Sequence, residues 1–152
     1  MNTATQQPAV RIDDALAYRI YRSARLLRGH FRELALNAGV ELSQEQWFVL
    51  NRLSHEDGLA QGQLGDAVLD DRPNMARLIA AMEQRGWVTR SDDPSDARKH
   101  LVFITPEGRR VHDIFDAGVP QARSRVLAGI SEEDAAKVAR VLSRIEFNLE
   151  KG

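Results

Sequence analysis

Residues 64–86, LGDAVLDDRPNMARLIAAMEQRG, decide the fold of this chain. The four-residue step from Leu64 to Val68 predicts a short helix over 61–69, and a turn over 70–72 follows it directly. A second helix is predicted over 72–85, because proline is tolerated in a first helical turn and glycine is common just after a helix. Its predicted buried stripe is Met75, Leu78, Ile79 and Met82.

The next segment changes from a helical period to a strand period. Residues 87–91 read as one strand, 92–96 as a charged turn, and 101–105 as the returning strand, with Leu101, Phe103 and Thr105 on one face. A short helix, a tight turn, a capped helix and a hairpin together form the winged helix-turn-helix arrangement. In that arrangement the second helix of the pair enters the major groove of DNA.

Further helices are predicted on both sides of this module. Apolar residues at three- and four-residue steps predict a long amphipathic helix over 12–38, and Ser43 with Gln46 matches a capping box at the start of another helix. After the hairpin, one helix is predicted from 105 to about 126 with a kink at Pro120, and a last helix follows Ser131. The predicted fold class is therefore mainly α with a small β-hairpin.

Composition and motifs narrow the classes of function. The chain has 152 residues, no cysteine and a formal net charge of −1, and its four histidines lack the spacing of metal ligands. We therefore expect no metal and no cofactor. No apolar run approaches the ~20 residues of a membrane span, and the first ten residues lack the apolar stretch of a signal peptide, so we expect a cytoplasmic protein without a membrane partner. No glycine-rich phosphate loop or nucleophile elbow is present, so we expect no catalytic residues and no enzyme.

A candidate DNA-binding surface emerges from the helix over 72–85 and the hairpin tip. The segment 72–110 holds eight basic and five acidic residues, although the whole chain is slightly acidic. With the apolar stripe inward, Asn74 and Arg77 face outward, and these side chains suit adenine and guanine edges in the major groove. Arg98 at the hairpin tip suits a minor groove with enhanced negative potential. A solvated helix face and a solvated turn are the alternatives.

The stretch from Leu64 to Val111 resembles the MarR family of bacterial regulators. The resemblance is carried by NMARL at 74–78, MEQRGWV at 82–88, DPSDAR at 93–98 and TPEG at 105–108. Each piece is weak alone, but their combination is specific, and the flanking helices match the family pattern as well. The chain departs from the family at Ala60 and Gln61, where a Thr or Ser cap of the third helix is usual.

The resemblance implies a homodimer that binds a roughly palindromic operator in double-stranded DNA, most often to repress transcription. It implies a flexible N-terminal arm over 1–11, a helical dimerisation region over 12–38 and 106–151, and a winged helix-turn-helix DNA-binding region over 39–105. Carried over by position, the residues that bind DNA are Arg72, Pro73, Asn74, Ala76, Arg77, Arg98 and Lys99, with Asp96 holding the wing.

The resemblance also implies a small aromatic or phenolic effector between the dimer helices and the winged module. The candidate pocket residues, which offer rings and cations, are Tyr18, Tyr21, Arg22, Arg25 and Trp47. Arginines spaced by three residues drift around a helix, so they do not all face one pocket, and solvation or ion pairing is their alternative role. We expect an aromatic acid to weaken DNA binding by changing the spacing of the two modules. The alternative functions are a ligand-independent activator and a protein-interaction adaptor without DNA binding.

Overall fold

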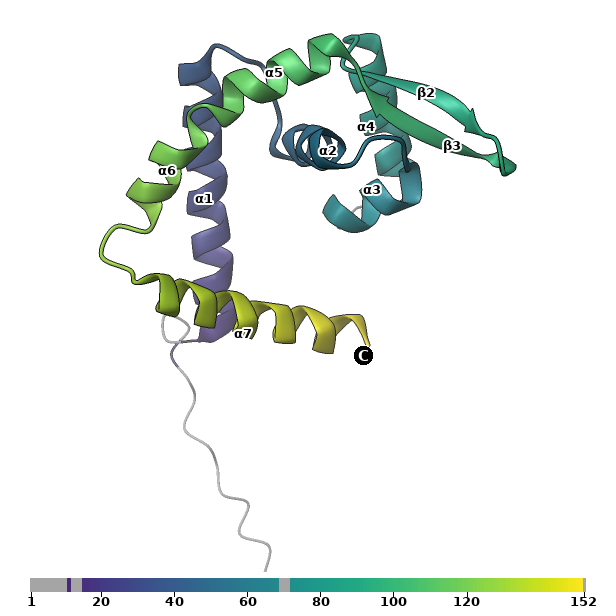
Figure 1. Ribbon diagram of the computed structural model, residues 1–152. Helices are drawn as coiled ribbons and strands as arrows, with labels where there is room; N and C mark the ends of the chain where they lie inside the picture. The colour runs from purple at the N-terminus through teal and green to yellow at the C-terminus, as the bar shows by residue number, and fades with distance from the viewer. Residues whose placement is uncertain (1–10, 12–14, 69–71, 152) are drawn as a thin grey trace, which may run out of the picture. The chain divides into compact units, whose positions relative to one another are not determined.

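The computed structural model describes residues 11, 15–68 and 72–151, and the chain divides into two compact units between Phe115 and Asp116. The first unit holds α1 (Leu16–Ala38), α2 (Gln44–His55), β1 (Leu59–Ala60), α3 (Gln61–Val68), α4 (Arg72–Gln84), β2 (Val88–Asp93), β3 (Asp96–Ile104) and α5 (Pro106–Asp116), which ends at the boundary. The second unit holds α6 (Val119–Val126) and α7 (Glu132–Glu150) (Figure 1). Apart from residue 11, the predicted arm over 1–11 lies outside the described residues, as do the start of the first helix at 12–14 and the turn at 69–71.

The helices begin where local capping signals place them. Ser43 Oγ accepts the N–H of Gln46 at 3.1 Å, and Gln46 Oε1 accepts the N–H of Ser43 at 3.0 Å, so the predicted capping box is formed. Ser131 caps α7 in the same way by accepting the N–H of Asp134. At the start of α3, Gln63 Oε1 accepts the N–H of Ala60 at 2.9 Å, which is the half of a capping box that needs no Thr or Ser side chain.

The wing is a three-stranded antiparallel sheet in the order β1-β3-β2. The predicted five-residue turn over 92–96 is wrong, because Asp92 pairs with His100 and only two residues separate β2 from β3. The hairpin is therefore longer than its apolar residues indicate, and a bulge follows Asp92. Strand β1, which no sequence pattern predicted, pairs Leu59 with Val102.

The structure decides which face of β3 turns inward, a question that the sequence pattern left open. Val102 and Ile104 are buried, whereas Leu101 and Phe103 are only half-buried. Four apolar residues in a row leave the phase of a strand open. The phase is decided by pairing, since Val102 lies opposite Leu59 and Ile104 lies opposite Val88.

The core of the first unit gathers side chains from α2, α3, α4, α5 and the sheet. The predicted stripe of α4 is confirmed at Met75, Ile79 and Met82, which are buried, while Leu78 is half-buried. A polar contact accompanies this packing, since Nε2 of His112, a residue only 6% exposed, lies 3.3 Å from Nδ2 of Asn51. This contact joins α5 to α2.

The second unit corrects the predicted single helix over 105–126. Helix α5 ends at Asp116 and α6 begins at Val119, so Pro120 lies in a first helical turn instead of bending a continuous helix. A proline there has no helical hydrogen bond to lose. Neither α6 nor α7 has a buried residue in the single chain. Among the described residues, no helix is both long enough and apolar enough to cross a membrane.

Candidate nucleic-acid interface

The outward side of α4 carries polar and small residues near the start of the helix. Because Met75, Ile79 and Met82 turn one side of α4 into the core, the opposite side stays at the surface. All five residues that the sequence predicts to approach DNA from this helix are at least partly exposed: Arg72, Pro73, Asn74, Ala76 and Arg77. No acidic residue stands in the first turn.

Asn74 and Arg77 are joined to each other one turn apart. Nη2 of Arg77 donates a hydrogen bond to Oδ1 of Asn74. The guanidinium is thereby held along the start of α4. The two side chains that can read purine edges are therefore presented together.

Two aspartates organise the tip of the wing. Asp93 Oδ1 accepts the hydroxyl of Ser95 at 2.7 Å and its N–H at 2.8 Å, and these bonds hold the pKa of Asp93 below its usual range. Asp96 Oδ1 accepts the backbone N–H of Arg98 at 3.0 Å and lies 3.6 Å from Nε of the same residue. The side chain of Arg98 is 95% exposed. The exposed guanidinium of Arg98 therefore lies at a turn whose backbone is held by hydrogen bonds to Asp93 and Asp96.

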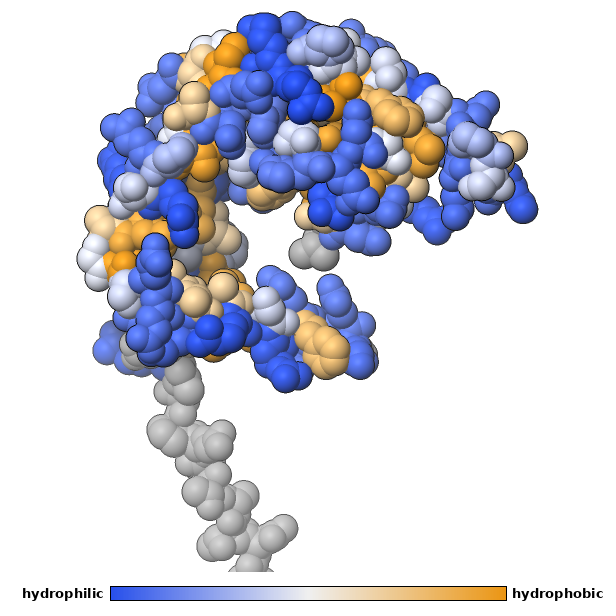
Figure 2. Space-filling view, viewed as in Figure 1, coloured by the Kyte–Doolittle hydropathy of each residue, from blue (hydrophilic) through white to orange (hydrophobic). Residues whose placement is uncertain are grey.

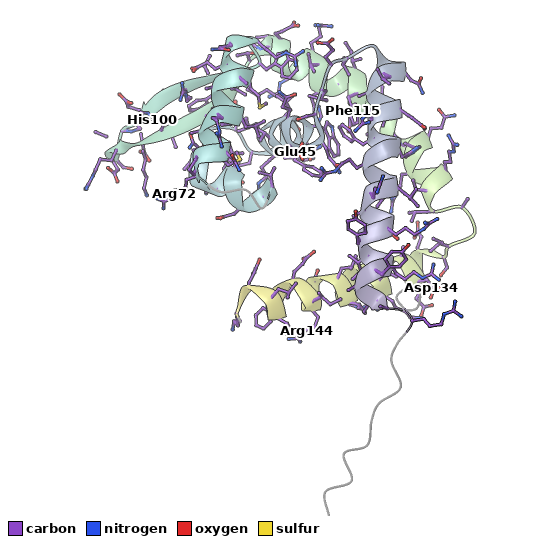
Figure 3. The ribbon with its side chains drawn as sticks, turned by 180° about the vertical axis from the view of Figure 1, so that it is seen from behind. Glu45, Arg72, His100, Phe115, Asp134 and Arg144 are labelled. Atoms are coloured by element: carbon purple, nitrogen blue, oxygen red, sulfur yellow. The ribbon has the colours of Figure 1, made fainter. Side chains whose placement is uncertain are left out.

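A cleft of about 550 Å³ lies between α3, the start of α4 and β3. Its cationic lining is Arg72, Arg98 and Lys99, joined by His100, against one carboxylate from Asp66. Figure 3 shows Arg72 and His100 on the same side of this unit. The fold therefore brings three predicted residues from two separate segments to one surface that suits a phosphate.

The sequence did not single out every residue of this cleft. Gln61 and Gln63 in the first turn of α3 also line it, as does His100. His100 directly follows Arg98 and Lys99, so its place in the charged run was a usable signal. The glutamines carry no comparable signal, because a polar first turn is common to exposed helices.

The base of the wing is locked to the helices beside it. Glu83 of α4 accepts Nη2 of Arg90 at 2.6 Å and Nε at 3.0 Å, and this bonding to Arg90 lowers the pKa of Glu83. On the other side, Thr105 Oγ1 donates to the carbonyl of Gly86 and accepts the N–H of Gly108 at 3.0 Å. These contacts set the placement of the wing relative to α4.

The remaining charges on the wing pair across the strands. His100 Nδ1 lies 3.1 Å from Oδ1 of Asp92 on the neighbouring strand.

In the part of the chain that the structure describes, no group of three or more His, Cys, Asp or Glu side chains could hold a metal ion. In Figure 2 mainly hydrophilic side chains cover the far end of the wing.

A second candidate site is an aromatic cluster between α1, α2 and α5. The ring centroids of Phe31 and Phe115 lie 4.6 Å apart, those of Trp47 and Phe115 5.3 Å apart, and those of Phe31 and Trp47 6.0 Å apart. Figure 3 labels Phe115 at this place. Two buried nitrogens of the described residues have no hydrogen-bond partner, Nε1 of Trp47 and Nε2 of His30, the neighbour of Phe31 in the chain. Unsatisfied buried polar atoms are uncommon in folded proteins, and a water molecule or a ligand can supply the partner.

The five predicted effector residues do not meet at this cluster. Arg22 precedes Phe31 by nine residues, which places it about half a turn away around α1. Tyr21, Arg22 and Arg25 are exposed and Tyr18 is half-buried, so Trp47 is the one of the five that joins the rings. His30, Phe31 and Phe115 were missed, because aromatic residues at helical spacing are read as core.

Comparisons with known proteins show which family the segment containing this interface matches and which solved structures share the fold of the chain. Residues 42–100 match the model of the MarR family. The PcaV transcriptional regulator from Streptomyces coelicolor, solved with its natural ligand, is 25% identical to this chain and has a TM-score of 0.78 over 92% of this chain and 97% of its own. A MarR-family transcriptional regulator from Rhodococcus sp. RHA1 is also 25% identical, with a TM-score of 0.79 over 92% and 98% of the two chains. The repressor CouR of Rhodococcus jostii RHA1, bound to a 23-mer DNA duplex, shares the fold at 21% identity, with a TM-score of 0.79 over 91% and 99%.

Proposed function

The chain belongs to the MarR family of transcriptional regulators, and we propose that it binds a roughly palindromic operator in double-stranded DNA as a homodimer and represses transcription. One observation carries this proposal. The cleft beside the start of α4 is lined by Arg72, Arg98 and Lys99 and by a single carboxylate, that of Asp66, and Arg77 is exposed on the same helix. Local charge of this kind decides attraction to phosphates, whatever the net charge of the chain.

Each part of this surface has a role in the proposed complex. Helix α4 enters the major groove, where Arg77 faces a guanine and Asn74 an adenine. Arg98 enters the adjacent minor groove from a wing tip that Asp96 preorganises. Arg72 and Lys99 lie at the cleft and bind backbone phosphates, which fix the position of the module on the duplex.

The proposed homodimer uses the helical regions 12–38 and 106–151. Support comes from large apolar side chains that the single chain leaves exposed on α1 and α7, among them Leu16, Leu26, Val138 and Leu149. Exposed apolar surface on several elements is typical of an association face. Two-fold symmetry would set the two α4 helices about one turn of DNA apart, which is why we propose a palindromic operator.

We further propose that a small aromatic carboxylate or phenol binds at the aromatic cluster and releases the operator. The rings of Phe31 and Trp47 are half-buried and can stack on a ligand, whereas Phe115 is buried against them, and the unsatisfied indole N–H of Trp47 can donate to an oxygen anion. The solved PcaV structure holds the natural ligand of that protein, and PcaV shares this architecture. Binding would change the spacing of the two DNA-binding modules.

The decisive experiment selects fragments of the source genome on the purified protein and measures their affinity by gel shift at several salt concentrations. We expect one enriched, roughly palindromic sequence and a strong loss of affinity in the double variant Arg77→Ala, Arg98→Ala. Arg109→Ala is the matched control, because Arg109 is exposed on α5 and lies outside the proposed surface. Absence of binding even at low salt would instead favour an adaptor, and promoter activation without ligand would favour an activator.

A further inference from the structure

Helix α1 carries an excess of exposed positive charge. Helix α1 carries five arginines, and none of them lies within 4.0 Å of a carboxylate among the described residues of the first unit: Arg19, Arg22, Arg25, Arg28 and Arg32. On α7, Glu146 and Glu150 are likewise unpaired, although Glu133 and Asp134 on the same helix both contact Lys137. Exposed side chains of opposite charge therefore lie on α1 and near the end of α7.

Each of the two helices carries a pair of like charges that repel each other. Arg28 and Arg32 lie four residues apart on α1, and Glu146 and Glu150 lie four residues apart on α7. Residues at this spacing are neighbours on a helix surface, and like charges placed there are destabilising. All four side chains are exposed in the single chain. A partner of opposite charge would turn both repulsions into attraction.

Apolar side chains flank both charged pairs. On α1, Leu36 is 72% exposed and lies one turn beyond Arg32, and Tyr21 is exposed on the same side of the helix. On α7, Leu149 is 77% exposed beside the two glutamates. Figure 2 shows apolar side chains among charged ones along α7. Apolar contacts bordered by complementary charges are the usual pattern of helices that pair with each other.

We propose that Arg28 and Arg32 of one copy form ion pairs with Glu146 and Glu150 of a second copy, and that these pairs select a second copy of this chain as the partner. The spacing fits, because both pairs span one helical turn, about 6 Å along the axis. Two-fold symmetry repeats the contact, so each dimer holds both crossed pairings. The inference rests on the proposed function, which requires two copies on one operator.

Charge reversal with mixing tests the pairing directly. One double variant, Arg28→Glu with Arg32→Glu, makes both helices acidic at the contact, and the other, Glu146→Arg with Glu150→Arg, makes both basic. We expect each variant alone to dimerise about tenfold more weakly than the wild type, or worse, in sedimentation experiments. An equimolar mixture is expected to form heterodimers of nearly wild-type affinity, because both crossed contacts are then complementary.

A matched control separates the effect of where the charges lie from the effect of the change in net charge. Arg140→Glu with Arg144→Glu changes the net charge as much as the acidic variant and has the same four-residue spacing, but lies on another side of α7. It is expected to leave the dimer dissociation constant within about threefold of the wild type. Circular dichroism confirms that each variant is folded. For the wild type, the dissociation constant is expected to rise between about 0.05 M and about 0.5 M salt, since salt screens exposed ion pairs.

The outcomes separate this inference from the proposed function. Wild-type dimerisation of both charge variants, or a dissociation constant that does not respond to salt, overturns the ion pairs and leaves the operator-binding dimer standing. Weakened dimers that mixing does not restore also overturn the inference, because crossed ion pairs between two copies would be complementary again in the mixture. A wild-type protein that stays monomeric and binds no selected fragment overturns the proposed function itself.

Discussion

The backbone of Gly108 lies directly against the carbonyl group of Trp87. A β-carbon placed on Gly108 would fall 2.1 Å from the carbonyl oxygen and 2.9 Å from the carbonyl carbon of Trp87. The N–H of Gly108 also donates to Thr105 Oγ1, which in turn donates to the carbonyl of Gly86. Helix α5 and the start of the wing therefore approach each other more closely than any side chain at position 108 allows.

Replacing this glycine is expected to destabilise the first unit. In Gly108→Ala the added methyl meets backbone, which cannot move aside cheaply, so we expect the free energy of unfolding to fall by about 1–3 kcal/mol. Urea unfolding followed by circular dichroism measures the change. The control is Gly29→Ala in α1, where a β-carbon meets no atom within 4 Å and alanine is the better helix former. Equal stability of the two variants would contradict the close approach.

Asp57 is expected to hold the wing although it is exposed. Its Oδ1 accepts the N–H of Ile104 at 2.9 Å and the N–H of Gly58 at 3.1 Å, so one carboxylate ties β3 to the loop after α2. Asp57→Ala should lower the free energy of unfolding by about 1–2 kcal/mol, measured by thermal or urea unfolding. Asp57→Asn keeps an acceptor oxygen and should recover part of the loss. An alanine variant as stable as the wild type would rule out this role.

The Glu83–Arg90 pair is expected to make stability depend on pH in the acidic range. Because bonding to Arg90 lowers the folded-state pKa of Glu83 below its unfolded value, the pair stabilises the fold above the unfolded pKa, near 4.3, and this contribution is lost as pH falls through the folded pKa. Glu83→Gln should be less stable than the wild type at neutral pH by under about 1 kcal/mol, since both side chains are partly exposed, and equally stable in strong acid.

Unfolding of Glu83→Gln and wild type over a pH series checks this difference. The control is Glu41→Gln, because the side chain of Glu41 is 97% exposed and lies 3.9 Å from Arg85. That variant should follow the wild-type curve. A gap between Glu83→Gln and wild type that persists unchanged into strong acid would contradict the assigned ion pair.

Arg77 and Arg98 are expected to give different signatures in DNA binding. Arg77→Ala should cost about 1–3 kcal/mol and relax preference at a single base position, because the residue reads a base edge. Arg98→Ala should weaken binding across sequences and reduce the slope of affinity against salt by about one, because its main partner is the negative potential of the groove. Affinities for a panel of single-base operator variants, each measured at several salt concentrations, separate the two. Identical signatures would refute the proposed docking.

Trp47→Phe is expected to separate effector binding from folding. The indole nitrogen has no hydrogen-bond partner in the described chain, so its removal should leave stability and unliganded operator affinity nearly unchanged. If that nitrogen binds the effector anion, the concentration needed for half-release should rise about tenfold, the equivalent of one hydrogen bond. Operator release is measured with a panel of phenolic and benzoic acids. No release by any of them in the wild type would end the effector proposal.

The helices and the surface of α4 could be predicted because their signals are local. The capping box of Ser43 and Gln46 and the stripe of Met75, Ile79 and Met82 each lie within a few turns of one helix. Once the buried side of α4 is known, helical geometry places Asn74 and Arg77 outward. The family resemblance adds the role of this surface, which periodicity alone does not contain.

The errors fall where distant segments meet. The length of the hairpin, which the sequence predicted wrongly, and the inward face of β3, which it left open, both depend on pairing with β1 and β2, and a continuous apolar run does not specify that pairing. Pro120 has the same local chemistry in a kinked helix and in a new first turn, and the structure has the latter. The five predicted effector residues remain a prediction, and only the three-dimensional structure shows that Trp47 lies against Phe31 while Arg22 is exposed about half a turn away around α1.

The sequence by itself determined the starts of α2, α4 and α7 and the outward face of α4, because each follows from hydrogen bonds and periodicities within a few turns of chain. Only the tertiary structure decided that Arg72, Arg98 and Lys99 border one cleft, that Asp57 holds β3, and that Gly108 must lack a side chain. Those relationships join residues far apart in sequence, and they arise only when the packing of the whole unit brings their backbones together.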